Sequence, residues 1–403
     1  MSTTGTPIRR VMLILQSAAV GGMETHCIDL AAEYVSRGIV VKAIVPEWPQ
    51  FDQLEERFRR AGALVGRLDT DAREGRSAQL RRWLNLVKMQ RSFDPDVVHL
   101  HTPGATGGLA VLITTRLASR ARLVVTEHDV PGHRTARKDL VARLSMNRLA
   151  HAIVAVSRRN AGLRTQRLGS APRQFAAVLN GVPVPSISPE ERHANRQRVR
   201  DQLGIDADRV VIGSLVRLAE GKGLHDLLRA FASVVKQFEC ELLLVGDGPL
   251  RGELEQLAVE LHMAGRVHFA GHHAAPAAFL DAMDAFVLAV PVGSMSIALL
   301  EAMGRGVPPA ITFCGPEEAV IPEETGLCAP PNDPEGLARV LLRMASDPEL
   351  RSRLGQAAGC HVSHHLSVAR VADDLLAIYT ARRNHLPVRL RADSPPDPRP
   401  GTR

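Results

Sequence analysis

The sequence predicts an α/β protein in which two doubly wound parallel sheets form two domains of similar size. Short apolar runs alternate with amphipathic helical stretches along nearly the whole chain. This alternation is typical of parallel sheets that are covered by helices on both faces. It is interrupted near the middle of the chain by a segment with several prolines and a charged run, 183–208. The interruption indicates a boundary between two arrays.

The first array begins with the apolar run Val11–Leu15, which follows Arg9 and Arg10. Five apolar residues are too few for a signal peptide or a membrane span, so we interpret the run as a buried strand. Helical spacing puts Cys27, Leu30 and Tyr34 on one face of a helix over 24–36. The strands expected in this array are Val11–Leu15, Ile39–Val45, Val97–Leu100, Leu123–Thr126, Ile153–Val156 and Ala177–Leu179.

The second array begins at residue 210 and contains a helix over Leu224–Val235, whose apolar residues form one stripe. Ligands of doubly wound sheets bind beyond the carboxyl ends of the strands, so the residues that follow each strand are the candidates for chemistry. The strands expected here are Val210–Leu215, Glu241–Val245, Val267–Ala270, Ala285–Leu288 and Pro309–Ile311.

These patterns divide the chain into five parts. We expect an N-terminal domain over 1–185, a linker with a short lead-in helix over 186–208, and a C-terminal domain over 209–365. A further helix is expected within 366–386. Residues 387–403 are rich in proline and arginine and are predicted to form a disordered basic tail.

Composition narrows the function classes. The chain has 403 residues, of which 45% are hydrophobic, so it can bury large cores and is not a disordered protein. Fifty Lys and Arg against 43 Asp and Glu give a net charge of +7, which suits phosphorylated small molecules, nucleic acid or an anionic membrane. Aromatic residues make up only 3%, too few for the stacking platforms that bind single strands. Nucleic acid is therefore not an expected partner.

Metal and disulfide sites are not predicted. The five cysteines are scattered, odd in number and without CxxC spacing. They indicate reduced, mostly buried thiols of a cytoplasmic protein. The pair His364 and His365 has no carboxylate or cysteine at the spacing of a metal site.

The first chemical motif is Arg217–Gly223, directly after an expected strand and before an expected helix. Its glycines allow close approach of the backbone, and a helix N-terminus favours an anion. Arg217 offers a planar fork and Lys222 a point charge, which together suit a diphosphate. A solvated basic turn is the alternative interpretation.

Two further motifs follow later strands. Gly246 and Gly248 form a tight turn after the strand that ends at Val245, a weak signal by itself. Glu301 is the one carboxylate in the apolar stretch 297–304. A buried carboxylate is costly unless it is paired. The hydroxyls of a ribose, or alternatively the domain's own backbone, would satisfy it.

In order and spacing, these motifs resemble family 4 of the retaining glycosyltransferases. The resemblance extends from about residue 8 to about residue 380, and the combination is far more specific than any single motif. The segments that carry it are Gly21–Glu24, Asp96–His101, Glu127–Asp129, Ala155–Ser157, Asn180–Val182, Arg217–Gly223, Val245–Leu250 and Leu300–Met303 with Gly306 and Pro308.

The resemblance implies a GT-B fold, in which two Rossmann-like domains face each other across a cleft. The N-terminal domain would bind the acceptor and the C-terminal domain the nucleotide sugar, with the last helix crossing back to the N-terminal domain. Arg217 and Lys222 would hold the donor diphosphate, and Glu301 the ribose. Gly22 would lend a backbone N–H near the phosphates, and His128 would lie beside the sugar unless its role is structural. No metal or cofactor is implied, since the basic pair and helix N-termini can stabilise the departing diphosphate.

The sequence departs from the family at one position. The family has two glutamates with seven residues between them, and Gly293 takes the place of the first. That carboxylate accepts hydrogen bonds from the donor sugar, each worth about 1.5–3 kcal/mol. An altered donor sugar, substitution by nearby polar groups, or a weakened enzyme would explain the change. Ser294 and Ser296 are candidates to contact the sugar, although Ser296 is better placed as a helix cap. Glu317 and Glu318 are the nearest carboxylates along the chain.

Basic residues suggest a membrane-associated acceptor. The stretch Arg134–Leu149 alternates arginine with leucine, a pattern suited to an anionic interface. Peripheral contact with the inner membrane would give access to a polyprenyl-diphosphate-linked sugar, whereas a merely solvated basic face is the alternative. The remaining histidines singled out by position are expected to be polar strand ends and loops: His99, His101, His133, His272 and His273.

We therefore predict a cytoplasmic glycosyltransferase that moves a hexose-type sugar, with retention, from a nucleotide-diphosphate donor to a glycan or lipid-linked acceptor in surface or exopolysaccharide biosynthesis. Two alternatives stay open. A nucleotide-sugar epimerase shares this architecture but uses additional carboxylates around the anomeric carbon. A non-catalytic protein that binds a nucleotide sugar would fit Gly293.

Overall fold

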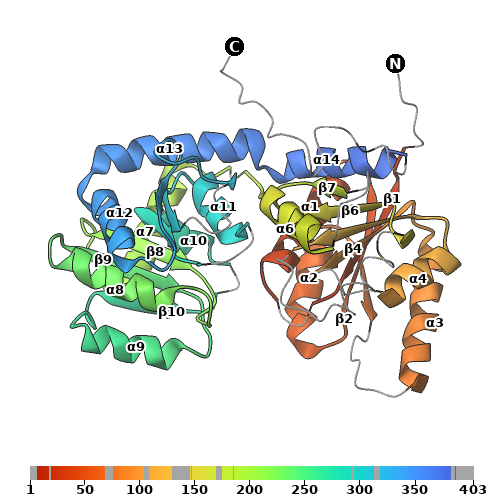
Figure 1. The fold of residues 1–403 in the computed structure, drawn as a ribbon, viewed down its shortest axis with the longest axis horizontal. Coiled ribbons are helices and arrows are strands. Elements are labelled where there is room, and N and C mark those ends of the chain that lie inside the picture. The colour runs from red at the N-terminus through yellow and green to blue at the C-terminus, as the bar shows by residue number, and fades with distance from the viewer. Residues whose placement is uncertain are drawn as a thin grey trace, which may run out of the picture. The chain divides into compact units, whose positions relative to one another are not determined.

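The structure is a computed structural model, and it describes residues 7–17, 20–68, 76–103, 109–128, 146, 148–168, 175–184, 186–273, 275–291, 295–312, 318–382 and 386. The chain divides into two compact units, each built around one parallel sheet (Figure 1). Unit 1 contains residues 1–180 together with 368–403, and unit 2 contains residues 181–367. The expected tail, 387–403, lies outside the described residues.

Unit 1 contains a sheet of seven described parallel strands in the order β3-β2-β1-β4-β5-β6-β7. Strand β1 lies between β2 and β4 and is almost fully buried, because helices cover both faces of the sheet. The strands are β1 Arg10–Leu15, β2 Val40–Pro46, β3 Leu64–Leu68, β4 Val97–Thr102, β5 Arg122–Glu127, β6 Ala152–Ala155 and β7 Phe175–Ala177.

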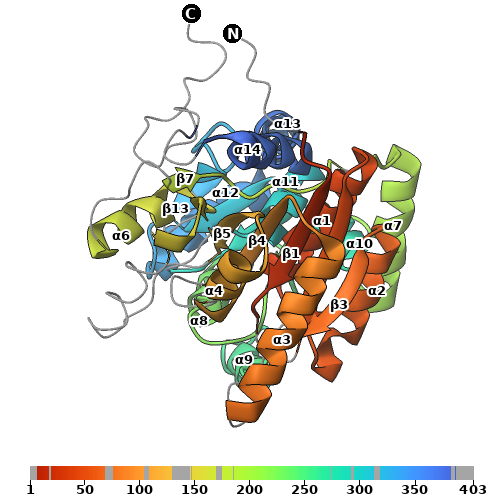
Figure 2. The ribbon, with the colours of Figure 1, turned by 90° about the vertical axis from the view of Figure 1, so that its right-hand side faces the viewer.

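Helices lie on both faces of this sheet (Figure 2). Alternate residues of β1 pack against the two helical layers. Val11 and Leu13 belong to a core shared with α1, α2 and α14, whereas Met12 and Ile14 belong to a core shared with α3 and α4. The described helices of this unit are α1 Gly22–Ser36, α2 Asp52–Arg60, α3 Arg76–Phe93, α4 Leu109–Ala118, α6 Arg158–Leu168 and α14 Val368–Thr380, with the short 3-10 helix η1 Pro49–Phe51.

Helix α14 comes last among the described helices, yet it completes the core of unit 1. Its buried residues Val371, Leu375, Ile378 and Tyr379 join the cluster formed by α1 and β1. The Tyr379 hydroxyl group is hydrogen-bonded to that of Tyr34 on α1, with an oxygen–oxygen distance of 3.0 Å. The N-terminal part of the chain therefore depends on a segment that follows unit 2 in the sequence.

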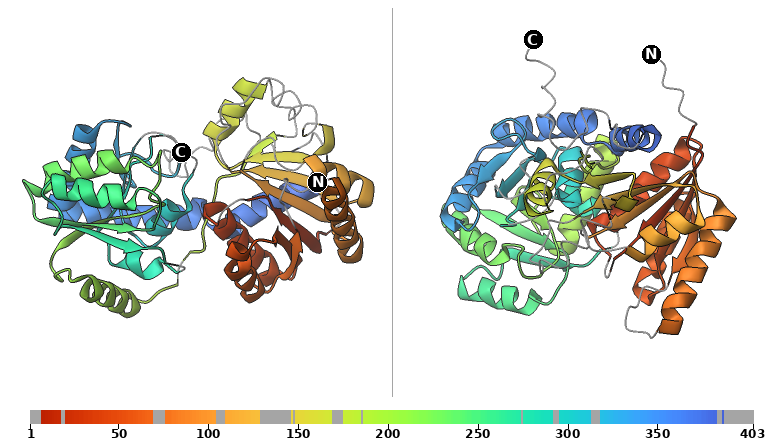
Figure 3. Two further views of the ribbon diagram at one scale, coloured as in Figure 1. Left: turned by 90° about the horizontal axis from the view of Figure 1, so that it is seen from below. Right: turned by 45° about the vertical axis from the view of Figure 1, so that its right-hand side comes forward.

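Unit 2 contains a sheet of six described parallel strands in the order β10-β9-β8-β11-β12-β13. This is the green and cyan sheet in the two views of Figure 3. Helices α8, α9 and α12 share a core with one face of it. The strands are β8 Val210–Leu215, β9 Cys240–Val245, β10 Val267–Gly271, β11 Ala285–Leu288, β12 Pro309–Thr312 and β13 Leu327–Ala329. The helices are α7 Pro189–Leu203, α8 Leu224–Val235, α9 Arg251–Glu260, α10 Ala277–Asp281, α11 Ile297–Gly304, α12 Pro334–Ser346 and α13 Pro348–His365.

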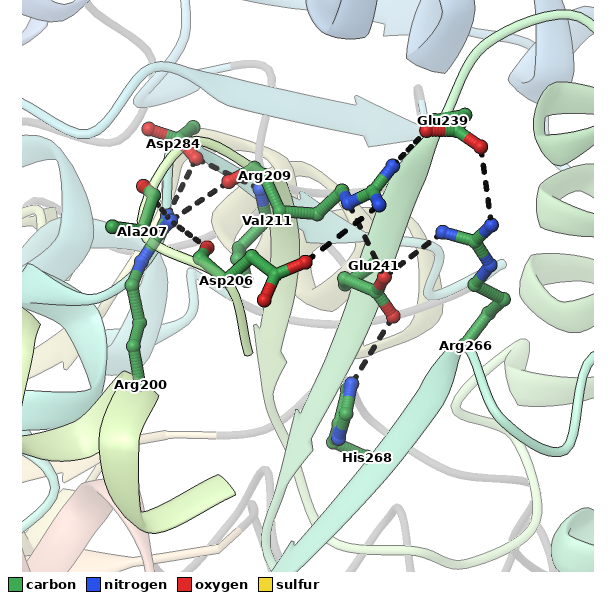
Figure 4. A network of polar contacts seen from close by, with 10 residues as sticks. All are labelled: Arg200, Asp206, Ala207, Arg209, Val211, Glu239, Glu241, Arg266, His268 and Asp284. Atoms are coloured by element: carbon green, nitrogen blue, oxygen red, sulfur yellow. Dashed lines mark hydrogen bonds and ion pairs between the residues drawn. The ribbon is translucent and has the colours of Figure 1, made fainter. Parts of the chain in front are cut away.

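The segment 186–208, expected to be a linker with a short lead-in helix, contains the 15-residue helix α7 and lies within unit 2. Arg200 of α7 is buried and donates hydrogen bonds to the carbonyl oxygens of Ala207 and Arg209 and to the Asp284 carboxylate (Figure 4). The sequence did not predict that Arg200 is buried, because an arginine in a highly charged helix is expected to be exposed. Asp284, one of its hydrogen-bond partners, is distant in the sequence.

Beside these contacts, a second polar cluster joins two strands of the sheet. Glu241 of β9 accepts hydrogen bonds from Arg266 and from His268 of β10, each at 3.1 Å (Figure 4). Burial acts to raise the pKa of Glu241, but the hydrogen bonds from His268 and Arg266 outweigh it and hold this pKa below its ordinary value.

The strands predicted from the sequence are present in both units, with ends shifted by at most two residues. Two strands were missed, β3 and β13, and both lie at the edge of their sheets. Edge strands bury less surface: β3 has the sequence LVGRL and is mostly half-buried. Among the described residues, no helix is both long and apolar enough to cross a membrane.

Candidate active site

Two of the predicted motifs are joined backbone to backbone in unit 2. The loop after β8 runs from Val216 to Gly223, and the loop after β9 starts at Gly246. The N–H of Leu218 donates to the carbonyl oxygen of Asp247, and the N–H of Leu250 donates to that of Leu218, each at 3.0 Å. The loops that carry Arg217 and Gly246 are thus one hydrogen-bonded structure.

Glycines make this close packing possible. Gly246 has φ +136°, and a Cβ atom there would overlap the carbonyl oxygen of Val216. A Cβ on Gly248 would overlap that of Leu218. The sequence suggested that these glycines let the backbone approach a ligand. In the structure, their immediate neighbours are the carbonyls of the adjacent loop.

Gly223 brings the loop after β8 into contact with a third loop, the one after β11. Its φ is +65°, it precedes the first residue of α8, and a Cβ atom there would overlap the carbonyl oxygen of Ala289, which follows β11. Strands β9, β8 and β11 are neighbours in the sheet. The loops after these three strands therefore meet at the carboxyl edge of the sheet, where ligands of this architecture bind.

The charged candidates lie on these loops and on the helix that follows β11. Arg217 is exposed, and Lys222 is half-buried just before the N-terminus of α8. Glu301 is half-buried on α11. Ser296 caps α11, accepting a hydrogen bond from the N–H of Leu299 at 3.4 Å, which confirms the expected cap.

Part of the predicted sugar site lies outside the described residues, namely Gly293, Ser294 and Glu317. Glu318, the other nearby carboxylate, is described and half-buried. The substitution of glycine for the first glutamate therefore remains a prediction about donor contacts.

In unit 1, Gly22 is the first residue of α1, and it is exposed. The first N–H groups of an α-helix have no acceptor within the helix, so Gly22 presents an N–H that can bind an anion. Next to it, the N–H of Gly21 donates to Glu24 Oε2 at 2.7 Å. This places the Glu24 carboxylate at the start of the helix, where burial raises its pKa.

His128 follows β5 directly and is 8% exposed. Its Nε2 atom lies 2.9 Å from Nδ1 of His101, which is on β4. Its backbone N–H donates to the carbonyl oxygen of Thr102 at 3.0 Å. His128 is therefore held at the carboxyl edge of the sheet by both its backbone and its ring.

The prediction of polar strand ends and loops is wrong for His99, which lies inside β4, whereas His101 lies near the end of that strand. Both are 0% exposed and lie on the face of β4 that α1 and α14 cover. His99 Nδ1 lies 2.6 Å from the Tyr379 hydroxyl, and its Nε2 lies 2.7 Å from Thr126 Oγ1. The spacing His-x-His on a strand, which puts both rings on one face, was the available signal. Of the others, His272 is exposed, His273 packs on Phe279, and His133 lies outside the described residues.

Burial keeps these imidazoles neutral. It lowers the pKa values of His99, His101 and His128 well below the usual range, and the neighbouring imidazoles lower them further. Cys27 of α1 lies beside His101 and His128, and burial raises the pKa of its thiol, with additional contributions from the Glu24 and Asp29 carboxylates. Sequence reasoning found His128 but did not find its neighbours.

The other cysteines only partly fit the expectation of buried thiols. Cys240 is buried, Cys328 is half-buried and Cys360 is exposed. Cys314 lies outside the described residues.

Family models match both halves of the chain. Residues 20–184 match the model described as Glycosyltransferase Family 4, and residues 195–359 match the model described as Glycosyl transferases group 1. This chain belongs to the family 4 glycosyltransferases. The resemblance inferred from the motifs is thereby confirmed, and the epimerase and the non-catalytic binding protein are not favoured.

Two relatives of this glycosyltransferase act in lipopolysaccharide core biosynthesis according to their names. The chain is 30% identical over 238 residues to the glycosyltransferase LpsD of Rhizobium meliloti (strain 1021), a match that covers 54% of this chain and 68% of LpsD. It is 35% identical over 158 residues to LpsE of the same organism, which covers 39% of this chain and 46% of LpsE. The match to LpsE thus spans less than half of that protein.

The fold is also shared with solved structures. The crystal structure of Anabaena HepE in complex with UDP has a TM-score of 0.76 and 22% sequence identity, and the match covers 91% of this chain and 98% of HepE. A further HepE structure contains UDP-glucose. The predicted GT-B fold with two Rossmann-like domains is confirmed.

Proposed function

We propose that this glycosyltransferase moves a sugar, with retention, from a UDP-sugar to a glycan or polyprenyl-diphosphate-linked acceptor during assembly of a surface polysaccharide. The observation that carries the proposal is the junction of the loops after β8, β9 and β11 in unit 2. UDP is favoured as the donor nucleotide because HepE has been crystallised with UDP and with UDP-glucose. The acceptor class is favoured by the names of LpsD and LpsE.

The residues at this junction have chemistry suited to a nucleoside diphosphate. Arg217 and Lys222 bring two positive charges to the loop after β8, at the carboxyl edge of the sheet. Lys222 adjoins the N-terminus of α8, where the helix dipole favours an anion. Positive charge at a fixed position stabilises the negative charge that develops on the leaving diphosphate. Glu301 has the chemistry to accept hydrogen bonds from ribose hydroxyls, and His128 in unit 1 to contact the sugar.

The first experiment is a thermal-shift screen against UDP-, GDP- and ADP-sugars, followed by turnover with the best donor. We expect a UDP-sugar to raise the unfolding temperature and to be consumed only when a glycan or lipid-linked acceptor is present, with the α-configuration kept in the product. Isomerisation of the free donor, or binding without transfer under these conditions, would contradict the proposal.

A matched pair of lysine variants tests the diphosphate contact. Lys222→Ala is expected to weaken donor binding by about 1.5–3 kcal/mol, roughly tenfold to more than a hundredfold in Kd. Lys236→Ala is the control, since Lys236 follows the opposite end of α8. Calorimetric titration with the donor measures both. Equal donor affinities for the two variants would show that Lys222 does not contact the diphosphate.

We further propose that unit 1 contacts an anionic membrane surface through α3 and α4, which pack against each other (Figure 1). The stretch first suggested, 134–149, lies mostly outside the described residues. On α3, Leu80 and Leu84 are 53% and 55% exposed and lie at helical spacing with Lys88 and Arg91. On α4, Leu117 is 68% exposed.

The composition of these two helices supports that partner. Neither α3 nor α4 contains an aspartate or glutamate, while Arg81, Lys88 and Arg91 are exposed. Exposed leucines among exposed cations are typical of surfaces that insert shallowly between anionic lipid headgroups. Such contact would bring the enzyme to a lipid-linked acceptor.

Flotation with vesicles tests this surface. We expect binding to vesicles that contain phosphatidylglycerol, weakened by salt, and little binding to phosphatidylcholine alone. The double variant Leu84→Gln/Leu117→Gln should bind about tenfold more weakly or worse, because each leucine contributes on the order of 1–2 kcal/mol when buried. Val259→Gln on α9 in unit 2, a residue that is 55% exposed, is the control. Equal flotation of both variants would show that Leu84 and Leu117 do not contact the membrane.

A further inference from the structure

Three side chains of metal-binding type meet in the interior of unit 1. Cys27 comes from α1, His101 from β4, and His128 follows β5. One ligand atom of each lies within 4.8 Å of those of the other two. Cys27 and His101 are 0% exposed and His128 is 8% exposed, so no solvated surface cluster is involved.

We infer that this cluster is a binding site for a zinc ion, with Cys27, His101 and His128 as protein ligands and a fourth position for water. Two imidazoles and one thiolate form a ligand set that suits Zn²⁺ among the metals available to a cell. The site contains none of the residues of the proposed diphosphate contact and goes beyond the proposed function, with which it shares only His128, the residue proposed to contact the sugar.

The spacing of the two rings is close to that of a loaded site. Nδ1 of His101 and Nε2 of His128 are 2.9 Å apart. In a tetrahedral site with Zn–N bonds of about 2.0–2.1 Å, two nitrogen ligands lie about 3.3 Å apart. A separation of the rings by a few tenths of an ångström would admit the ion between them.

Among the described residues, Oε1 of Glu24, which lies on the same helix as Cys27, is buried and has no hydrogen-bond partner. Two neutral imidazoles can form only one hydrogen bond between Nδ1 of His101 and Nε2 of His128. A cation between them would be coordinated by the lone pairs of both nitrogens.

The rings are also held in position, as a binding site requires. The His101 ring packs against His99 with 4.1 Å between ring centroids, and His99 is fixed at both nitrogens by Tyr379 and Thr126. A metal would connect α1 to the carboxyl ends of β4 and β5. It would thereby position both His128 and the helix whose N-terminus carries Gly22.

Metal binding is measured on the full chain, first stripped with a chelator and then titrated with Zn²⁺ or with Co²⁺ as a spectroscopic probe. We expect one equivalent of Zn²⁺ per chain to survive dialysis. Co²⁺ should give the intense visible bands of a tetrahedral site and a near-ultraviolet charge-transfer band from sulfur. Wild-type protein that binds no stoichiometric metal, or whose Co²⁺ spectrum lacks the sulfur band, overturns the inference.

Two serine variants assign the sulfur ligand. Cys27→Ser should abolish the sulfur-to-cobalt band and weaken Zn²⁺ binding at least about tenfold. Cys360→Ser removes an exposed thiol and should leave both unchanged. Circular dichroism of the stripped Cys27→Ser protein verifies that it is folded, and an unaltered spectrum in that folded variant contradicts the assignment. Donor and acceptor are absent from these measurements, so their outcome is independent of the transferase assay.

Discussion

At the scale of single residues, Gly221 and Gly223 lie in the same loop, but the structure requires glycine at the two positions for different reasons. Both have positive φ, +75° and +65°. A Cβ on Gly221 would meet nothing within 4 Å, whereas one on Gly223 would overlap the Ala289 carbonyl. At Gly221, only the left-handed backbone conformation requires glycine. At Gly223, the close contact between the loops after β8 and β11 also leaves no room for a Cβ atom.

Alanine variants test this difference. Gly221→Ala should cost about 1–2 kcal/mol for the left-handed conformation. Gly223→Ala should cost more than about 2 kcal/mol and also lower donor affinity, because the loops must separate. Gly252→Ala, at an open helical position, should stabilise by up to about 1 kcal/mol. Thermal unfolding and donor titration measure these effects, and equal losses for the two loop variants would refute the steric argument.

At the scale of elements, hydrogen bonds to Glu241 join β9 to β10 and to Arg266 at the start of β10. The pKa of this carboxylate is lower in the folded protein than its ordinary value near 4.5. The stability gained from ionised Glu241 is therefore fully present above pH ~4.5 and is lost as the pH falls through the lowered folded pKa.

Glu241→Gln should therefore destabilise unit 2 by about 1–2 kcal/mol at pH 7, and the difference from wild type should shrink below pH ~4. The expected loss is small because Arg266 is partly exposed and solvent screens its charge. Denaturant unfolding at both pH values measures it. Glu260→Gln, on the exposed side of α9, should change little at either pH. A difference that stays constant with pH would mean that the carboxylate charge is not what stabilises the pair of strands.

At the scale of the whole molecule, the two units differ in how the chain builds them. Unit 2 is continuous, from 181 to 367, whereas unit 1 needs the last helix. Helix α14 contributes Val371, Leu375, Ile378 and Tyr379 to the core of unit 1. Their burial contributes about 6–12 kcal/mol, comparable to the total stability of about 5–15 kcal/mol of a typical domain.

Fragments should show this asymmetry. Residues 181–367 are expected to fold alone with a cooperative thermal transition, while 1–180 should lack one. Adding 368–403 in trans should restore the transition of 1–180, because it supplies the missing face of the core. Scanning calorimetry of the two fragments and of the full chain tests this. A cooperative, wild-type-like transition of 1–180 alone would contradict it.

The sequence by itself determined the alternation of strands and helices, the family, and the charged candidates Arg217, Lys222 and Glu301, because apolar periodicity and local motifs are properties of neighbouring residues. Only the tertiary structure decided that Gly223 contacts Ala289, that α7 belongs to unit 2, and that Cys27, His101 and His128 meet. These contacts join positions up to a hundred residues apart, and they depend on strand order and register, which local periodicity does not specify.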